Sequence, residues 1–175
     1  NSYKLFLELG YFLLKNDGVM AQIVPSGIYS DKGSTELRRL LVGHCRWLIL
    51  HGYHNHKGIF AIHRSFKFCA LVVVKGGQTE EIQCRFLRVS PDEADDRSIA
   101  YRVDTLKSLS PDHLAFTEIP HASDLELIER MARTCSPLGV LHHKNGLARG
   151  ENDISISFRR EFDMTNDSKF FIERS

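Results

Sequence analysis

Four histidines gather in one short stretch of the chain, and histidine is a common protein ligand of zinc. They are His51, His54, His56 and His63. Their spacing does not follow that of established zinc sites, and no cysteine lies among them. Exposed loop histidines are the simpler interpretation, so the sequence predicts no metal site here.

Basic side chains accompany these histidines and recur elsewhere. Arg38 and Arg39 lie in a predicted helix, and Arg159 and Arg160 lie near the end of the chain. Such residues could contact phosphate groups, and contacts of that kind fix position rather than sequence preference. Solvated surface charge is an equal alternative, because a net charge of +1 neither indicates nor excludes a nucleic-acid partner.

The composition is that of an ordinary globular protein. Of the 175 residues, 42% are hydrophobic and 26% are charged, which suits one domain or a partial domain with an appendage. No apolar run approaches the roughly 20 residues of a membrane-spanning helix. The four cysteines form no C-x-x-C pair and three fall in or beside apolar runs, which predicts buried free thiols and favours a reducing cytoplasm.

Periodicity predicts how these residues are positioned. Apolar residues at helical spacing predict a helix over about 2–14, and a strand follows at 19–25. A second helix at about 34–42 leads to the continuous apolar run 47–50, which is typical of a strand covered on both faces. Residues 19–50 therefore predict a strand–helix–strand crossover, which should be right-handed.

A third buried strand is predicted at 68–74, after too few residues for another crossover helix. It should therefore run antiparallel to the second strand. We expect an α/β fold, with a partial Rossmann-like sheet of three mixed strands followed by a smaller α+β connecting region. That region should hold a strand at 81–89, a helix at 103–109, a strand at 114–119 and a helix at 123–133.

Taken in order, these segments resemble the C-terminal half of an S-adenosylmethionine-dependent DNA adenine-N6 methyltransferase. More narrowly, they are similar to the methyltransferase region of type IIG restriction–modification enzymes and related phage-defence methylases. A further block resembles the segment that joins the catalytic domain to the target-recognition domain in those enzymes; it contains the string R-E-F-D-M-T-N-D at 160–167. The matching blocks are residues 3–8 with 13–15, 18–26, 58–75 and 157–168.

Two motifs of that family do not occur in the sequence. The family uses a Gly-rich turn to approach the cofactor and an [N/D]-P-P-[Y/F] loop to hold the target adenine, but neither G-x-G nor P-P is found. The chain also begins without an initiator Met, within its first predicted helix. The resemblance implies that both motifs lie upstream, in a missing N-terminal half. Leu5, Phe6, Leu9 and Leu13 should then lack their strand neighbours, and self-association could cover them.

The resemblance also assigns roles to two aromatic residues. Phe6 matches the position that lines the pocket for the cofactor's adenine ring, although plain helix–sheet core is an alternative. Phe60 matches the loop aromatic that packs against the target base once it is flipped from the duplex. A hydrophobic plug under the loop is the alternative for Phe60. The insertion 61–65 leaves Phe66 and Phe68 as competitors for its role.

The predicted parent protein is therefore a site-specific adenine-N6 DNA methyltransferase that uses S-adenosylmethionine and binds double-stranded DNA. Residues 1–77 would belong to its catalytic domain, 78–140 to an α+β extension and 141–175 to a linker before a target-recognition domain. The 175 residues alone should be inactive. A non-catalytic nucleic-acid-binding or assembly module on a methylase-like scaffold is the alternative. The DNA-contact candidates are Lys57, His63, Arg64, Arg159 and Arg160.

Overall fold

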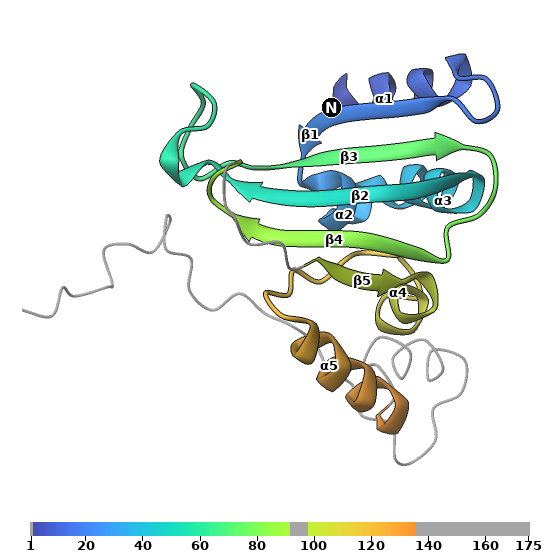
Figure 1. Ribbon diagram of the computed structural model, residues 1–175, viewed down its shortest axis with the longest axis vertical. Coiled ribbons are helices and arrows are strands. Elements are labelled where there is room, and N and C mark those ends of the chain that lie inside the picture. The colour runs from blue at the N-terminus through green and yellow to red at the C-terminus, as the bar shows by residue number, and fades with distance from the viewer. Residues whose placement is uncertain (1, 92–97, 136–175) are drawn as a thin grey trace, which may run out of the picture. The chain divides into compact units, whose positions relative to one another are not determined.

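A computed structural model describes residues 2–91 and 98–135 of the chain (Figure 1). Contacts group residues 1–135 into one compact unit. The described helices and strands follow in the order α1 (Ser2–Leu13), β1 (Val19–Pro25), α2 (Gly27–Ser30), the 3-10 turn η1 (Lys32–Ser34), α3 (Thr35–His44), β2 (Cys45–His54), the 3-10 turn η2 (Asn55–Lys57), β3 (Lys67–Lys75), β4 (Glu81–Arg88), β5 (Ile99–Arg102), α4 (Val103–Leu109) and α5 (Ala122–Thr134).

The strands form one mixed sheet in the order β1-β3-β2-β4-β5. β3 lies between β1 and β2 and runs antiparallel to both, whereas β2 and β4 are parallel and β4 and β5 antiparallel. β1 and β2 therefore run in the same direction, as a strand–helix–strand crossover requires. The predicted mixed α/β sheet is confirmed, and so is the antiparallel third strand; β4 and β5 extend the same sheet beyond the three strands expected.

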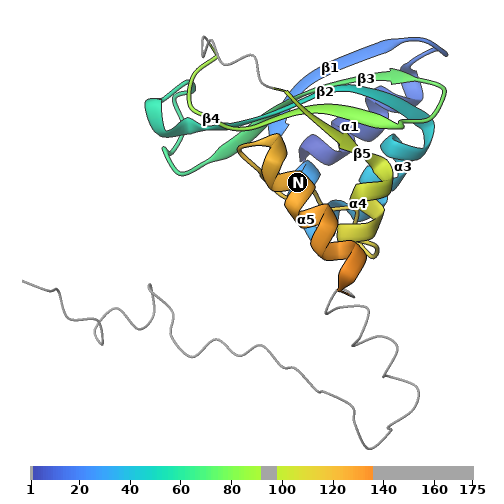
Figure 2. The same ribbon diagram turned by 60° about the horizontal axis from the view of Figure 1, so that its bottom comes forward.

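The helices α1, α3, α4 and α5 lie on the same face of the sheet (Figure 2). Alternate strand residues point into the core on this face, because successive side chains of a strand point to opposite sides. Gly10 lets α1 approach closely, since a Cβ there would lie 2.5 Å from the Met20 sulfur. The buried strand residues of the core include Met20, Val24, Trp47, Leu50, Leu71, Val73, Ile82 and Cys84.

The opposite face of the sheet carries no helix among the described residues (Figure 2). Val19 and Ile23 of β1 are 59% and 61% exposed, while Met20 and Val24 are buried. Leu48, which sits at a register shift in β2, is 45% exposed. The expectation that the apolar run 47–50 is covered on both faces is therefore wrong for this part of the chain.

α1 presents much of its apolar surface to solvent. Leu7 is its only buried residue, so the helix packs on the sheet through the side that holds Leu7. Its exposed large apolar residues are Leu5, Phe6, Leu9, Phe12 and Leu13. Leu5, Phe6, Leu9 and Leu13 are therefore open to solvent, and the expectation that their strand neighbours belong to a missing N-terminal half stays a prediction.

Residues 114–119 form no strand, contrary to the prediction. Leu114 has a φ of 50°, which lies outside extended backbone. The segment instead packs into the core: the Phe116 N–H donates to the Tyr29 carbonyl at 2.9 Å, and the Phe116 ring stacks on Trp47 with centroids 5.8 Å apart. This path brings Glu118 next to Tyr29 of α2.

Cys45, Cys69 and Cys84 are buried free thiols, as predicted, and Cys135 is exposed. Within the described ranges, no helix has the length and apolar character needed to cross a membrane. The domain boundaries expected after residues 77 and 140 stay predictions.

Candidate functional site

An apolar pocket lies where β1 ends and β3 begins. The register pairs Pro25 of β1 with Phe68 of β3, and the loop between β2 and β3 supplies the remaining wall. The cavity measures about 170 Å³. An apolar cavity of about 150 Å³ can hold benzene, so this one has room for an aromatic ring. We call it the aromatic pocket; its lining residues are Ile23, Val24, Pro25, Phe60, Ile62, Phe66, Lys67 and Phe68.

The pocket brings together the three phenylalanines considered for stacking against the target base, Phe60, Phe66 and Phe68. Phe68 is buried and forms the inner wall, with its ring stacked on Tyr53 at a centroid distance of 5.3 Å. Phe60 meets Phe68 edge to face at 4.9 Å and is 40% exposed, while Phe66 is 57% exposed. Phe60 is therefore packed on one side and open on another, which is the arrangement a stacking platform needs.

The loop at 55–66 also carries three of the basic candidates. Lys57, His63 and Arg64 are all exposed. The Arg64 guanidinium lies against Gly58 and donates to the His56 carbonyl at 3.2 Å. His63 is held by a contact between its Nδ1 and Ser65 Oγ at 2.7 Å. The loop thus carries the cationic side chains of Lys57 and Arg64 together with His63 and Phe60, whereas Arg159 and Arg160 lie outside the described residues.

A buried asparagine, which the sequence reasoning missed, organises this loop. Asn55 is fully buried, and its side chain hydrogen-bonds to the backbone of Phe60 and Ile62. The signal that could have found it is the spacing Asn55-His-Lys-Gly58. Asn favours turns, and Gly58 has the positive φ of 72° that suits glycine.

A polar network holds Lys67, which lines the pocket. Glu118 accepts hydrogen bonds from the Tyr29 hydroxyl and from the Lys67 ammonium, each at 2.6 Å. Burial opposes ionisation of Glu118, but the bonds from Lys67 and Tyr29 and the charge of Lys67 outweigh it and lower the pKa of the carboxyl. Burial, followed by the bond to Glu118, raises the pKa of Tyr29. Glu118 is therefore a carboxylate and Tyr29 a neutral donor at pH 7.

The histidines of this region do not form a metal site within the described residues, where no group of three or more metal-ligating side chains occurs. The His54 and His56 rings stack with centroids 5.1 Å apart. Burial, Arg85 and Arg88 lower the pKa of His51 to about 4. His51 is thus uncharged at pH 7.

Two other candidates lie elsewhere. Phe6 is 63% exposed on α1 and does not line the aromatic pocket. Arg38, expected as a phosphate contact, is fully buried instead. Its guanidinium donates to the carbonyls of Ile28, Asp31 and His113 at 2.8–3.0 Å. It therefore ties α3 to α2, to the residue that follows α2 and to the segment at His113, and it does not face solvent.

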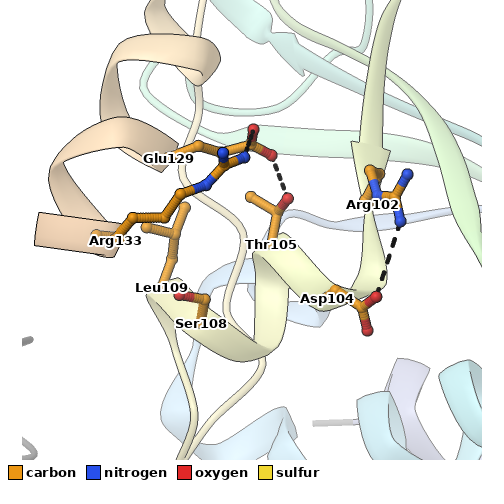
Figure 3. Close-up of a pocket in the computed structure, with 8 residues that line it drawn as sticks. Arg102, Asp104, Thr105, Ser108, Leu109, Glu129 and Arg133 are labelled. Atoms are coloured by element: carbon orange, nitrogen blue, oxygen red, sulfur yellow. Dashed lines mark hydrogen bonds and ion pairs between the residues drawn. The ribbon is translucent and has the colours of Figure 1, made fainter.

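A second cavity, of about 330 Å³, lies between α4 and α5 (Figure 3). Its lining is polar, and its charged groups pair with one another. Thr105 donates to Glu129, Arg133 lies 3.6 Å from the same carboxylate, and Arg102 lies 3.8 Å from Asp104. Of these contacts, only that of Thr105 with Glu129 joins α4 to α5. Because the charged groups named here are already paired, the aromatic pocket remains the better candidate for a ligand.

Comparison with known proteins gives the fold its family context. No protein-family profile matches the sequence, and no curated protein does. A solved structure that describes the assembly and conformational transition of a type I restriction–modification system aligns with 83% of this chain, with a TM-score of 0.54 and 17% sequence identity. The fold of this chain is similar to part of that type I restriction–modification structure.

Two other restriction–modification proteins align with lower TM-scores. The M protein of the type I enzyme EcoKI has a TM-score of 0.46 and 20% identity over 78% of this chain. The type IIG restriction endonuclease BpuSI has a TM-score of 0.40 and 22% identity over 77%. The chain spans 39%, 26% and 12% of the length of the three matched chains, respectively. The chain thus corresponds to only part of each matched chain.

Proposed function

We propose that the chain is part of a DNA methyltransferase of a restriction–modification or phage-defence system, which transfers a methyl group from S-adenosylmethionine to adenine N6. The observation that carries the proposal is the aromatic pocket with its basic loop, on a fold of this class. A base flipped from a duplex loses its stacking partners and needs an aromatic surface in their place.

Phe60 would supply that surface in the proposed complex. Its ring is supported by Phe68 and partly open to solvent, so a base can stack on it without first displacing core packing. Lys57, His63 and Arg64 on the same loop would contact the phosphates on either side of the flipped nucleotide. Such contacts position the protein on DNA, while the recognition sequence would be read elsewhere.

We further propose that β1 is not the edge of the complete sheet. Its outer edge has no partner strand among the described residues, and apolar side chains are exposed on both sides of it. Val19 and Ile23 are exposed on one face, and Leu9 and Leu13 of α1 on the other. An α/β sheet buries both faces under helices, so these residues suit continuation of the sheet beyond β1.

That continuation is proposed to be the N-terminal half of the catalytic domain, with the Gly-rich turn and the [N/D]-P-P-[Y/F] loop. Phe6, which is exposed on α1, would then line the cofactor's adenine pocket. The proposal keeps residues 1–77 in the catalytic domain, 78–140 as its extension and 141–175 as the lead into target recognition. Buried free thiols suit a cytoplasmic location for such an enzyme.

The test uses the longest protein that the gene encodes, next to the 175-residue chain alone. Each is incubated with tritium-labelled S-adenosylmethionine and unmethylated plasmid DNA, and the DNA is digested to nucleosides. We expect N6-methyladenine from the longer protein and none from the chain alone. Label in another base, or turnover by the chain alone, would contradict the proposal.

A variant series then tests the pocket. Base–aromatic stacking contributes about 1–3 kcal/mol, so Phe60→Ala should lower kcat/KM for DNA roughly 5- to 150-fold. Met131→Ala, at an exposed apolar residue of α5, is the matched control and should change little. Calorimetry on the longer protein distinguishes the proposed enzyme from the alternative function. Cofactor binding would support the enzyme, whereas DNA binding without cofactor binding would support a non-catalytic module.

A further inference from the structure

Asn55 holds the backbone of Phe60 at both of its polar groups. The Asn55 Oδ1 accepts from the Phe60 N–H at 2.9 Å, and the Asn55 Nδ2 donates to the Phe60 carbonyl at 3.0 Å. The same Nδ2 donates to the Ile62 carbonyl at 3.1 Å. One side chain therefore fixes the peptide groups on either side of the Phe60 Cα.

The backbone of Asn55 closes the same loop. Its N–H donates to the Phe66 carbonyl at 3.0 Å, and its carbonyl accepts from the Gly58 N–H at 2.8 Å. Asn55 is fully buried, so its amide has no water to exchange with and its bonds to the loop are costly to lose. The loop is consequently ordered from within, by a residue that does not line the pocket.

We propose that Asn55 is a positioning residue that directs the Phe60 ring to the aromatic pocket before a ligand arrives. This inference rests on the proposed role of Phe60 in stacking a base. A loop that is already ordered loses less conformational entropy when the base binds, so the benefit of the clamp is preorganisation. Asn55 itself touches neither base nor cofactor in this scheme.

The first experiment tests the clamp without relying on the proposed function. Hydrogen exchange of the 175-residue chain is compared with that of Asn55→Ala and of Asn55→Asp, which keeps the Oδ1 acceptor but loses both Nδ2 donors. In Asn55→Ala we expect the Phe60 amide to exchange at least about tenfold faster, with the amides of β3 unchanged. In Asn55→Asp the second carboxylate oxygen would face the Phe60 and Ile62 carbonyls instead of donating to them, so the Phe60 amide should also exchange faster than in the unaltered chain. Unchanged exchange of the Phe60 amide in Asn55→Ala would overturn the proposal, and so would general loosening of β3 in both variants.

The second experiment is a double-mutant cycle on methylation by the longer protein. If Asn55 acts through Phe60, Asn55→Ala should lower kcat/KM for DNA about tenfold, and the double variant with Phe60→Ala should be no worse than Phe60→Ala alone. Additive losses would refute positioning through Phe60. Normal kinetics in Asn55→Ala with impaired Phe60→Ala would also refute it. Normal kinetics in Phe60→Ala would instead refute the proposed function.

Discussion

Arg38 and Arg39 are adjacent on α3, but only Arg38 is buried. Replacing each by Met tests how much burial changes the contribution of an arginine to the free energy of unfolding. The Arg38 side chain is fully buried and donates to three backbone carbonyls. The Arg39 side chain is 48% exposed; it pairs with Glu36 at 2.8 Å and donates to the Asp112 carbonyl at 2.8 Å. Met keeps the apolar stem of arginine and removes the guanidinium from both positions.

The expected losses differ because only one position is closed to water. Arg38→Met leaves the carbonyls of Ile28 and His113 without the Arg38 donors, whereas the Asp31 carbonyl keeps a bond from the Ser34 N–H at 3.0 Å. Each unsatisfied buried acceptor costs about 1–3 kcal/mol, and part of this is offset because a buried cation no longer has to be desolvated. We therefore expect a net loss of about 2–4 kcal/mol. Arg39→Met removes a surface ion pair and one exposed hydrogen bond, and should cost no more than about 1 kcal/mol.

Urea unfolding of the 175-residue chain measures both values. The chain has a single tryptophan, and Trp47 lies in the core, so its fluorescence reports the loss of packing around it. For Arg38→Met, the urea concentration at the unfolding midpoint should be well below that of Arg39→Met, while the dependence of the unfolding free energy on urea concentration stays the same. Equal losses in the two variants would refute the reasoning, and so would a loss below about 1 kcal/mol for Arg38→Met.

Three further predictions follow from single residues. Folding lowers the pKa of His51 from 6.5 to about 4, so at a pH between these two values His51 is protonated in the unfolded chain but not in the folded one. The free energy of unfolding should therefore fall by about 2 kcal/mol from pH 7.5 to pH 5. His51→Asn should remove this loss, as measured by urea titrations at both pH values. Folding lowers the pKa of Glu118, so its contribution to the free energy of unfolding is present above pH 4.5 and is lost as the pH falls through the folded-state pKa. Glu118→Gln should therefore reduce the fall of the melting temperature at acid pH. Gly58→Ala, at a φ of 72° beneath the Arg64 guanidinium, should cost about 1–2 kcal/mol and lower the melting temperature.

The elements that the sequence predicts correctly have long, strongly periodic patterns. The apolar runs of β1, β2 and β3 and the helical spacing in α1, α3 and α5 are of this kind. β5 was not predicted, because Ile99–Arg102 is only four residues long and is too short for a recognisable alternating pattern. Its pairing with β4 could not be predicted from the residues near it in the sequence. Residues 114–119 are rich in apolar residues and were predicted as a strand, but Leu114 turns the chain and the Phe116 N–H donates to the Tyr29 carbonyl instead of to a neighbouring strand.

Part of the candidate site could be predicted because its aromatic residues are close together in the sequence. Phe60, Phe66 and Phe68 lie within nine residues of one another, so their grouping follows from local sequence. Glu118 meets Tyr29 and Lys67 across 89 and 51 residues, and nothing near it in the sequence indicates those partners. Arg38 could not be told from Arg39 by residue type, because the carbonyls that surround it come from loops before and after α3.

The position of β3 in the sheet has a consequence for synthesis of the protein. β1 and β2 precede it in the chain, but they do not pair with each other, because β3 lies between them and bonds to both. During translation, the edges of both strands that face β3 stay unpaired until residue 75 has left the ribosome. Unpaired apolar strand edges favour aggregation, so nascent chains that end before β3 should be those most dependent on chaperones.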